Sequence, residues 1–364
     1  MDALAGPNRL EYRPVAGRLV RCGSPNELAV SDFEYGVSLI RTGSSHAERF
    51  LEYLSQLHRG VMESYVEWIE AFGRHIAFSL DRRRSLQVLQ SAYCWWRTFA
   101  ASVDDSGTLN VAAALRGFLS AGAENQGGRA GVRRAIRTVI TAVAGSEIEA
   151  RECSGFIRRF NVARRLHDLL VGFIGIAASA HARYVGPERA SSMLWQALAT
   201  CSFFSGFWNA ALKATASERA VLLAEEFRGH FSGPQRHGSV RILTSENAYT
   251  LVLNPCGSGG ALRRHLTKRS RCGFSEFPIL AGAQWSAHHA VPAYCVHCVQ
   301  NESYASLRCG HPLWRTMFEP TDSGSCSWHI SRARERKSDP REVPAHDEGP
   351  GLSARLRPQA KSDS

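Results

Sequence analysis

The feature that most constrains this chain is a long apolar stripe in its N-terminal half. Large apolar side chains recur every three or four residues from Phe50 to Phe72, a spacing that places them on one face of an α-helix. Similar spacing continues between glycine-, proline- and aspartate-containing breaks, in segments 86–99, 109–119, 132–143, 156–170, 193–212 and 221–227. We therefore predict a helical domain over residues 45–231, beginning at Ser44 or Ser45.

The periodicity changes from helical to alternating after Gly233 and Pro234. Apolar and polar residues alternate at 240–242 and 249–253, on either side of a polar run, which is typical of a β-hairpin. Residues 1–44 contain glycine and proline too often for a long element, and we predict an irregular lead-in of strand and loop. The expected fold is mainly α, with a helical domain followed by a small α+β, metal-stabilised module at 232–330.

The last segment, 331–364, mixes positive and negative charges with prolines and almost no aliphatic residues. Such a segment cannot offset the entropy cost of ordering by burying apolar surface. We therefore predict a disordered tail there.

The C-terminal module is rich in cysteine. Of the 10 cysteines in the chain, six lie between Cys256 and Cys326. The N-terminus has charges and a proline where a secretory signal needs an unbroken apolar run, so we expect a cytoplasmic protein with reduced thiols. In that setting clustered cysteines favour metal binding or catalysis over disulfides.

Four cysteines occupy motifs suited to a metal. Cys256 opens a glycine-rich turn, in which backbone amides can point at a thiolate. Cys295 and Cys298 have the Cys-x-x-Cys spacing that lets two thiolates reach one tetrahedral ion, and Cys326 lies in a short strand-like segment. We expect these four to hold a structural zinc ion, with an iron–sulfur cluster as the alternative.

Other residues compete as ligands. Cys309 and His311 are two apart, so on a strand they would share a face and complete a Cys₃His set with the Cys-x-x-Cys pair. His329 is three residues after Cys326, and odd separations on a strand face opposite sides. His297 lies inside the Cys-x-x-Cys motif, where we expect it to point away from the metal. Which of Cys309, His311 and His329, if any, replaces one of the four cysteines stays open at this point.

These motifs together resemble a group of uncharacterised bacterial proteins with a helical N-terminal part and a C-terminal Pro-Cys-Gly-x-Gly-Gly, Tyr-Cys-x-His-Cys and Cys-x-aromatic signature. The matching residues are 255–260, 294–298 and 326–328, within a likeness that runs from about Tyr65 to Ile330. Gly310 and Pro312 belong to that pattern and Cys309 does not, so the resemblance implies the four-cysteine set. It implies no activity. A shorter likeness, to small-molecule-sensing domains of the vinyl-reductase type, covers only 324–330.

The formal charge of +11 raises the question of a polyanionic partner. Most arginines are spread along the predicted helices, and the one compact basic block, which we expect to be an exposed loop, comprises Arg263, Arg264, His265, Lys268, Arg269 and Arg271. It contains no aromatic residue on which an unpaired base could stack, so we expect only weak, nonspecific nucleic-acid binding. The longest uncharged stretch, 190–212, contains polar residues, and we predict a buried helix there rather than a membrane span.

The sequence leaves enzymatic activity undecided. It contains no His-Glu-x-x-His, no phosphate-binding loop and no dinucleotide-binding glycine motif. His230 ends the last predicted helix beside the proposed domain junction, where ligand pockets are favoured. Three hypotheses follow: a helical domain that binds a small molecule or a protein partner, an enzyme with its pocket at the junction, and a nucleic-acid-binding protein that uses the basic block.

Overall fold

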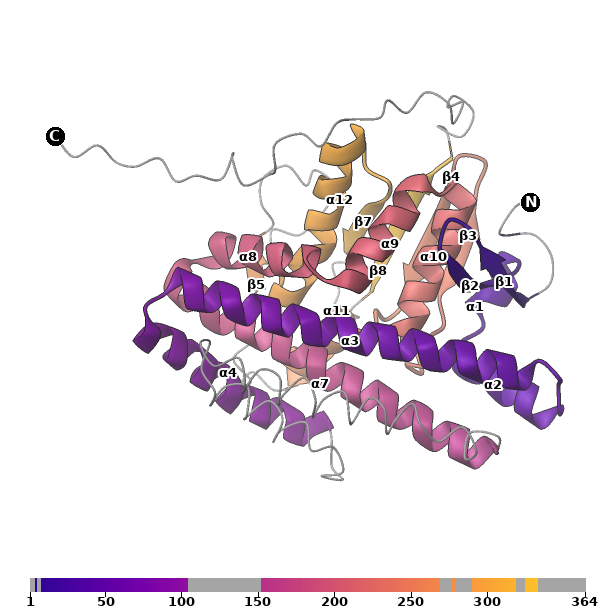
Figure 1. Cartoon of the computed structure of the whole chain (residues 1–364), viewed down its shortest axis with the longest axis horizontal. Coiled ribbons are helices and arrows are strands. Elements are labelled where there is room, and N and C mark those ends of the chain that lie inside the picture. The colour runs from indigo at the N-terminus through magenta and orange to yellow at the C-terminus, as the bar shows by residue number, and fades with distance from the viewer. Residues whose placement is uncertain are drawn as a thin grey trace.

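The computed structural model describes residues 4, 8–103, 152–268, 276–278, 290–318 and 325–332. This part of the chain is mainly helical, with a small antiparallel sheet toward the C-terminus, as predicted (Figure 1). The segments expected to be helical at 109–119 and 132–143 lie outside the described residues.

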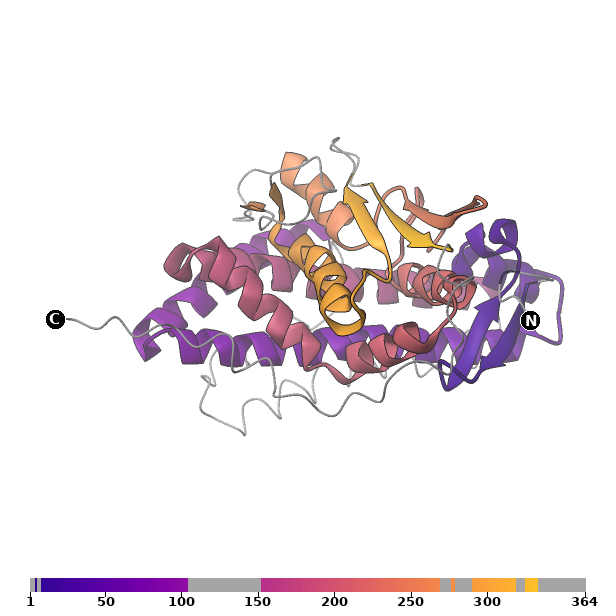
Figure 2. The same ribbon diagram turned by 90° about the horizontal axis from the view of Figure 1, so that it is seen from above.

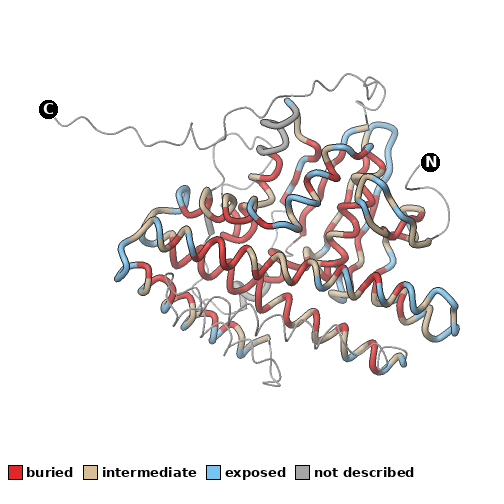
Figure 3. The backbone as a smooth tube through the Cα atoms, viewed as in Figure 1, coloured by how far each residue is buried: buried red, intermediate tan, exposed pale blue. Residues whose placement is uncertain are grey.

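Two long helices form the base of the molecule. Helix α3 (Ala47–Ser79) and helix α7 (Cys153–Val185) run side by side, and α4 (Arg82–Val103) packs along α7 (Figure 1). The predicted apolar stripe is buried, since Phe50, Trp68 and Phe72 are each at most 2% exposed. Long stretches of α3 and α7 are accordingly coloured as buried in Figure 3. Helix α3 begins after His46, which caps it without a side-chain hydrogen bond, so the predicted serine caps are wrong.

Three shorter helices cover this base. Helix α8 (Pro187–Ala199) follows the predicted break at Gly186, and α9 (Ser202–Lys213) and α10 (Ala216–Gly229) complete the helical part. The uncharged stretch expected to form one helix is therefore split after Ala199. No helix in the described part of the chain is long and apolar enough to cross a membrane.

The N-terminal lead-in is more regular than predicted. Strands β1 (Arg9–Arg13) and β2 (Arg18–Cys22) form a hairpin, followed by helices α1 (Pro25–Ala29) and α2 (Asp32–Arg41). Both helices begin with a capping box, in which a serine and the glutamate three residues later satisfy each other's backbone amides. The Ser-x-x-Glu spacing is visible in the sequence at 24–27 and 31–34, so this signal was available.

The C-terminal part forms a four-stranded antiparallel sheet of order β3-β4-β8-β7. The predicted hairpin is confirmed as β3 (Arg241–Thr244) and β4 (Ala248–Leu253), and β8 (Cys326–Ser331) pairs with both β4 and β7 (Arg315–Phe318). The remaining elements are helix α11 (Gly259–Lys268), the short strands β5 (Glu276–Pro278) and β6 (Ala290–Pro292), the 3₁₀ turn η2 (Ala293–Cys295) and helix α12 (Val296–Cys309).

One continuous hydrophobic core joins the helical part to the sheet. Trp328 on β8 packs against Phe227 on α10, with ring centroids 4.9 Å apart, and Trp314 packs against Trp208 on α9 at 5.0 Å. Figure 2 shows the sheet and α12 lying on one face of the helical base. The predicted boundary near residue 232 therefore marks a change of secondary structure within a shared core.

A buried ion cluster ties the lead-in to the helices. The Asp32 carboxylate lies 2.6 Å from Arg21 and 3.2 Å from Arg228, and all three side chains are at most 1% exposed. Because buried charges are tolerated only when paired, this cluster requires α2, the hairpin and α10 to meet.

The structure corrects two further predictions. Most of the basic block lies on helix α11 rather than in a loop, and Arg269 and Arg271 fall outside the described residues. The predicted tail begins too early, because Ser331 ends β8 and Arg332 donates its backbone amide to Asn247 at 2.8 Å. Residues 333–364 lie outside the described part.

Candidate functional site

The four predicted ligands come from three separate segments. Cys256 follows β4, Cys295 ends η2, Cys298 lies in the first turn of α12 and Cys326 begins β8. The register of β4 with β8 pairs Leu253 with Cys326, so strand pairing brings the third segment to the glycine-rich turn.

The structure brings all four thiols into one neighbourhood. A hydrogen bond with Cys326 is the largest influence on the Cys256 thiol and lowers its pKa well below the usual value. That bond, with burial, raises the pKa of Cys326. Burial also raises the pKa of Cys298, and the nearby Cys295 and Cys256 add to the rise.

The backbone amides of the glycine-rich turn point at the Cys256 sulfur, as the sequence predicts. Backbone amides of Ser258 and Gly260 hydrogen-bond the Cys256 sulfur. A Cβ atom on Gly259 would lie 2.2 Å from the Cys295 sulfur, so only glycine lets the turn approach so closely. Nevertheless, no group of three or more His, Cys, Asp or Glu side chains among the described residues is arranged to hold a metal ion. Metal ligation by the four cysteines thus stays a prediction.

The structure describes the backbone around Cys309 and the contacts of His329 and His297. Cys309 ends helix α12 and Gly310 caps it in a left-handed conformation, so the strand that would place Cys309 and His311 on one face does not exist. On β8, His329 contacts Thr250 at 3.0 Å and Ser327 at 3.1 Å. His297 lies 2.5 Å from the Tyr294 carbonyl through Nδ1, and its Nε2 is 3.4 Å from the Cys298 sulfur.

A second polar cluster lies beside the cysteines and was not predicted as a group. The Tyr65 hydroxyl on α3 is 2.8 Å from His230 Nδ1 at the end of α10, and 3.4 Å from His167 Nε2 on α7. The two histidine nitrogens are 3.2 Å apart. Tyr294 completes the cluster with its hydroxyl 2.8 Å from that of Tyr65. We call these four residues the Tyr–His cluster.

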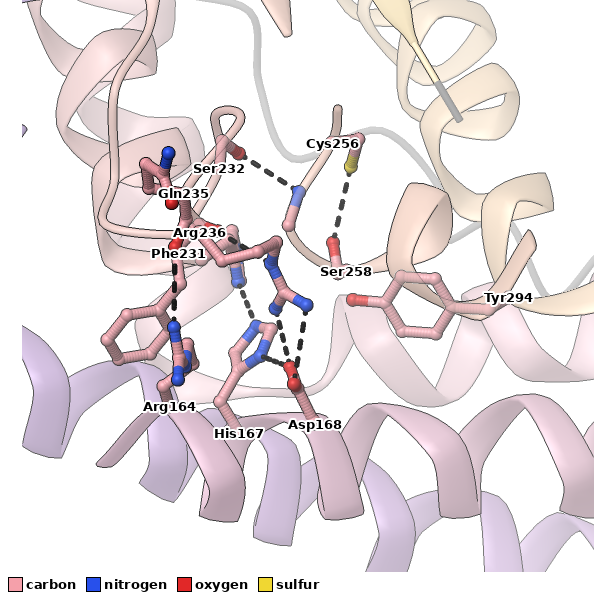
Figure 4. A network of polar contacts seen from close by, with 12 residues as sticks. Arg164, His167, Asp168, Phe231, Ser232, Gln235, Arg236, Cys256, Ser258 and Tyr294 are labelled. Carbon is pink, nitrogen blue, oxygen red and sulfur yellow. Dashed lines mark hydrogen bonds and ion pairs between the residues drawn. The ribbon is translucent and has the colours of Figure 1, made fainter. Parts of the chain in front are cut away.

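Charged residues surround the Tyr–His cluster. His167 Nδ1 is 3.0 Å from the Asp168 carboxylate, which accepts a 2.6 Å hydrogen bond from Arg236. His230 Nε2 is 2.9 Å from Glu226. In Figure 4, His167 and Asp168 project from their helix toward the loop that carries Arg236, and Tyr294 points in from the other side.

Burial sets the protonation states here. It lowers the pKa of His167 to about 4, so this imidazole is neutral at pH 7. Burial alone would raise the pKa of Asp168, but Arg236 and His167 outweigh it and bring that pKa to about 2. The pKa of Tyr65 is raised well above its usual range by burial and by Tyr294.

The two groups are joined by a hydrogen-bonded path. Ser258 lies 3.6 Å from the Cys256 sulfur through its hydroxyl and also hydrogen-bonds Tyr294. The path therefore runs from Cys256 to Tyr65 and His230, across the meeting point of the helical part and the C-terminal segments. Side chains at its edge reach solvent, since Glu226 is 22% exposed and His230 is 16% exposed.

Sequence reasoning identified only part of this arrangement. His230 was a candidate because it ends a helix near the junction, and Tyr294 lies in the cysteine signature. Tyr65 belongs to the predicted apolar stripe, and His167 and Asp168 lie in the predicted helical segment 156–170, so none of the three is predicted as a site residue. A histidine–aspartate pair at an apolar position of a helix is a weak signal that could have directed attention to α7.

Comparisons with known proteins identify no relative of this chain. No protein-family model, no curated protein and no solved structure matches this chain.

Proposed function

We propose that this is a zinc-binding protein whose Cys256, Cys295, Cys298 and Cys326 hold one structural ion. The ion would join the glycine-rich turn, the start of α12 and the start of β8, next to the helical part. The observation that carries the proposal is the electrostatic interaction of all four thiols, from three segments, in one buried neighbourhood.

The donor chemistry fits zinc. Four cysteines with two of them in a Cys-x-x-Cys pair are a standard structural zinc set, and thiols lose their protons when the metal binds. Amide hydrogen bonds from Ser258 and Gly260 already favour a thiolate at Cys256. An ion with four protein ligands has no open position for water or substrate, so its role would be to stabilise the fold. Ligand binding or chemistry would then fall to the residues beside it.

The experiment is metal analysis of the full chain purified without oxygen, together with its absorption spectrum. We expect one zinc ion that depends on the cysteines and no iron–sulfur absorption. Replacing Cys295 and Cys298 together with Ser should remove this ion, whereas the exposed Cys94 on α4 can be replaced by Ser as a matched control without loss. A zinc content in the double variant equal to that of the wild type would refute the proposal.

A second pair of variants tests the choice of the fourth ligand. Cys326→Ser should lower the zinc content, whereas Cys309→Ser combined with His311→Ala should not, because Cys309 ends a helix instead of lying on a strand. The opposite ordering would show that the Cys₃His set holds the ion.

We also propose that the helical part binds a small molecule or a protein partner at the junction, and one observation favours an enzyme as the second candidate. Two histidines, two tyrosines and their carboxylate partners meet at the interface between the helical part and the C-terminal segments. Such convergent groups suit proton transfer. Ligand-observed NMR with small carboxylates, phosphates and amines should detect binding that His230→Ala abolishes and His237→Ala retains. Equal binding by both variants would place the ligand elsewhere.

A further inference from the structure

The inner atoms of the Tyr–His cluster form a compact triangle of three possible ligands. His167 Nε2, His230 Nδ1 and the Tyr65 oxygen are separated by 3.2, 2.8 and 3.4 Å. His167 lies on α7 and Tyr65 on α3, and His230 is the C-cap residue of α10; the shared core holds all three helices. Their positions are therefore determined by packing rather than by a flexible loop.

The hydrogen-bond partners of the two rings determine which nitrogens carry protons. Asp168 and Glu226 are carboxylates, which when ionised only accept hydrogen bonds. Each therefore requires a proton on the ring nitrogen that it faces, His167 Nδ1 and His230 Nε2. In neutral imidazoles the other nitrogens then carry lone pairs, and those are the two that face each other.

When both imidazoles are neutral, these three atoms together lack one hydrogen-bond donor. The two lone pairs cannot hydrogen-bond each other across 3.2 Å, and the hydroxyl of Tyr65 supplies only one proton. Buried lone pairs left without a partner are costly, so a positively charged species between them, either an added proton or a metal ion, is favoured. A histidine whose second nitrogen is held by a carboxylate is also the usual form of a metal-bound histidine.

The dimensions of the triangle suit a small transition-metal ion. Zinc–nitrogen bonds of about 2.0–2.1 Å place neighbouring ligands of a tetrahedral site about 3.3–3.4 Å apart. The two separations that involve His167, 3.2 and 3.4 Å, lie close to that value, and the 2.8 Å hydrogen bond between Tyr65 and His230 would lengthen when an ion binds. The set of two imidazoles and a phenol is distinct from the thiol groups, and such nitrogen-rich donors suit zinc, copper or iron.

We propose that His167, His230 and Tyr65 bind a divalent first-row transition-metal ion at a site separate from the four cysteines. Asp168 and Glu226 orient the two imidazoles, and Tyr294 hydrogen-bonds the Tyr65 oxygen. Three protein ligands leave one position of the ion open for water or a ligand, which is the arrangement of catalytic rather than structural zinc. The proposal stands independently of the cysteine-bound zinc.

The test uses the full chain expressed with added zinc, and counts the zinc ions bound per molecule. Cobalt substitution then distinguishes the sites, because thiolate ligands give a charge-transfer absorption that nitrogen and oxygen ligands do not. We expect His230→Ala to lose one metal ion and to keep any thiolate absorption. His237→Ala is the matched control, since His237 packs against Phe160 on α7 and Phe33 on α2 but lies outside the triangle.

Two conservative variants keep the test decisive if the alanine variant does not fold. Tyr65→Phe retains the ring and removes the ligand oxygen, and it should bind the second ion more weakly. Glu226→Gln alters only a partly exposed partner of His230 and should weaken binding by about 10–100-fold.

The outcomes separate this proposal from that of the cysteine site. A single ion per chain, without thiolate absorption and lost in His230→Ala, would support this site and refute the cysteine site. Unchanged metal content and affinity in folded His230→Ala, or in Glu226→Gln, would overturn this proposal. So would a wild-type protein whose only metal is lost with Cys295 and Cys298.

Discussion

Gly257 lies where the turn after β4 closely approaches the backbone that follows α10. A Cβ atom on this residue would be 1.7 Å from the His230 carbonyl oxygen and 2.6 Å from the Phe231 carbonyl carbon. The Gly257 amide also donates to the buried Ser232 hydroxyl at 3.1 Å. Both neighbours are backbone, so a Gly257→Ala variant cannot relieve the contact by rotating a side chain.

The expected cost of Gly257→Ala follows from these distances. Normal contact between carbon atoms is about 3.5–4.0 Å, so one of the two chain segments must move by well over 1 Å. Overpacking of this kind costs about 1–3 kcal/mol, occasionally more. Because the atoms in contact here are backbone atoms, we expect a cost of about 3 kcal/mol or more. About 3 kcal/mol lowers the ratio of folded to unfolded protein by about two powers of ten.

Urea unfolding followed by tryptophan fluorescence measures this change, because Trp314 and Trp328 lie in the core beside the sheet. Gly206→Ala on α9 is the control, since a Cβ atom there meets nothing within 4 Å. Removing glycine from a helix interior should stabilise the protein by about 0.5–1 kcal/mol. If the free energy of unfolding of Gly257→Ala lies within about 0.5 kcal/mol of the wild-type value, the close approach of these two segments is wrong.

Three further predictions concern the helical part. Gly172→Ala should destabilise the protein by about 1–3 kcal/mol in the same unfolding assay, because a Cβ there would lie 2.1 Å from the Phe99 ring; combining it with Phe99→Leu should recover part of the loss. Asp32→Ala should cost about 3–5 kcal/mol, because it leaves two buried arginines without their carboxylate, and an unchanged urea midpoint would contradict the ion cluster. Burial lowers the pKa of His181 from 6.5 to about 4, so its neutral form stabilises the fold fully above pH 6.5. That contribution, at most about 3 kcal/mol, is lost as the pH falls toward 4, and His181→Gln should flatten the dependence of unfolding free energy on pH in this range.

The local elements that the sequence predicts well are those with a strong repeating pattern. The stripe from Phe50 to Phe72 has a period that only a helix satisfies, and α3 buries it. The hairpin at β3 and β4 follows from alternation around a turn. Local patterns of this kind depend on which residues lie next to one another along the chain, which is information that the sequence contains directly.

The sequence predicts less where the local signal is weak. Helices α1 and α2 are short, and their evidence was two capping boxes rather than a long apolar repeat. The predicted tail begins too early, because the pairing of β8 with β4 extends to Ser331. Strand length here is determined by a partner from a distant part of the chain.

For the candidate site, the sequence alone predicts the four cysteines as a group, because their motifs and their local density together favour a metal. Only the tertiary structure places Tyr65, His167, His230 and Tyr294 together, since these residues are separated by up to 229 positions along the chain. Each is unremarkable in its own helix or turn, and nothing in its neighbours predicts a partner on another element. The packing of α3, α7 and α10 around one core brings their polar atoms within 3.4 Å of one another, and this proximity creates the possible chemistry.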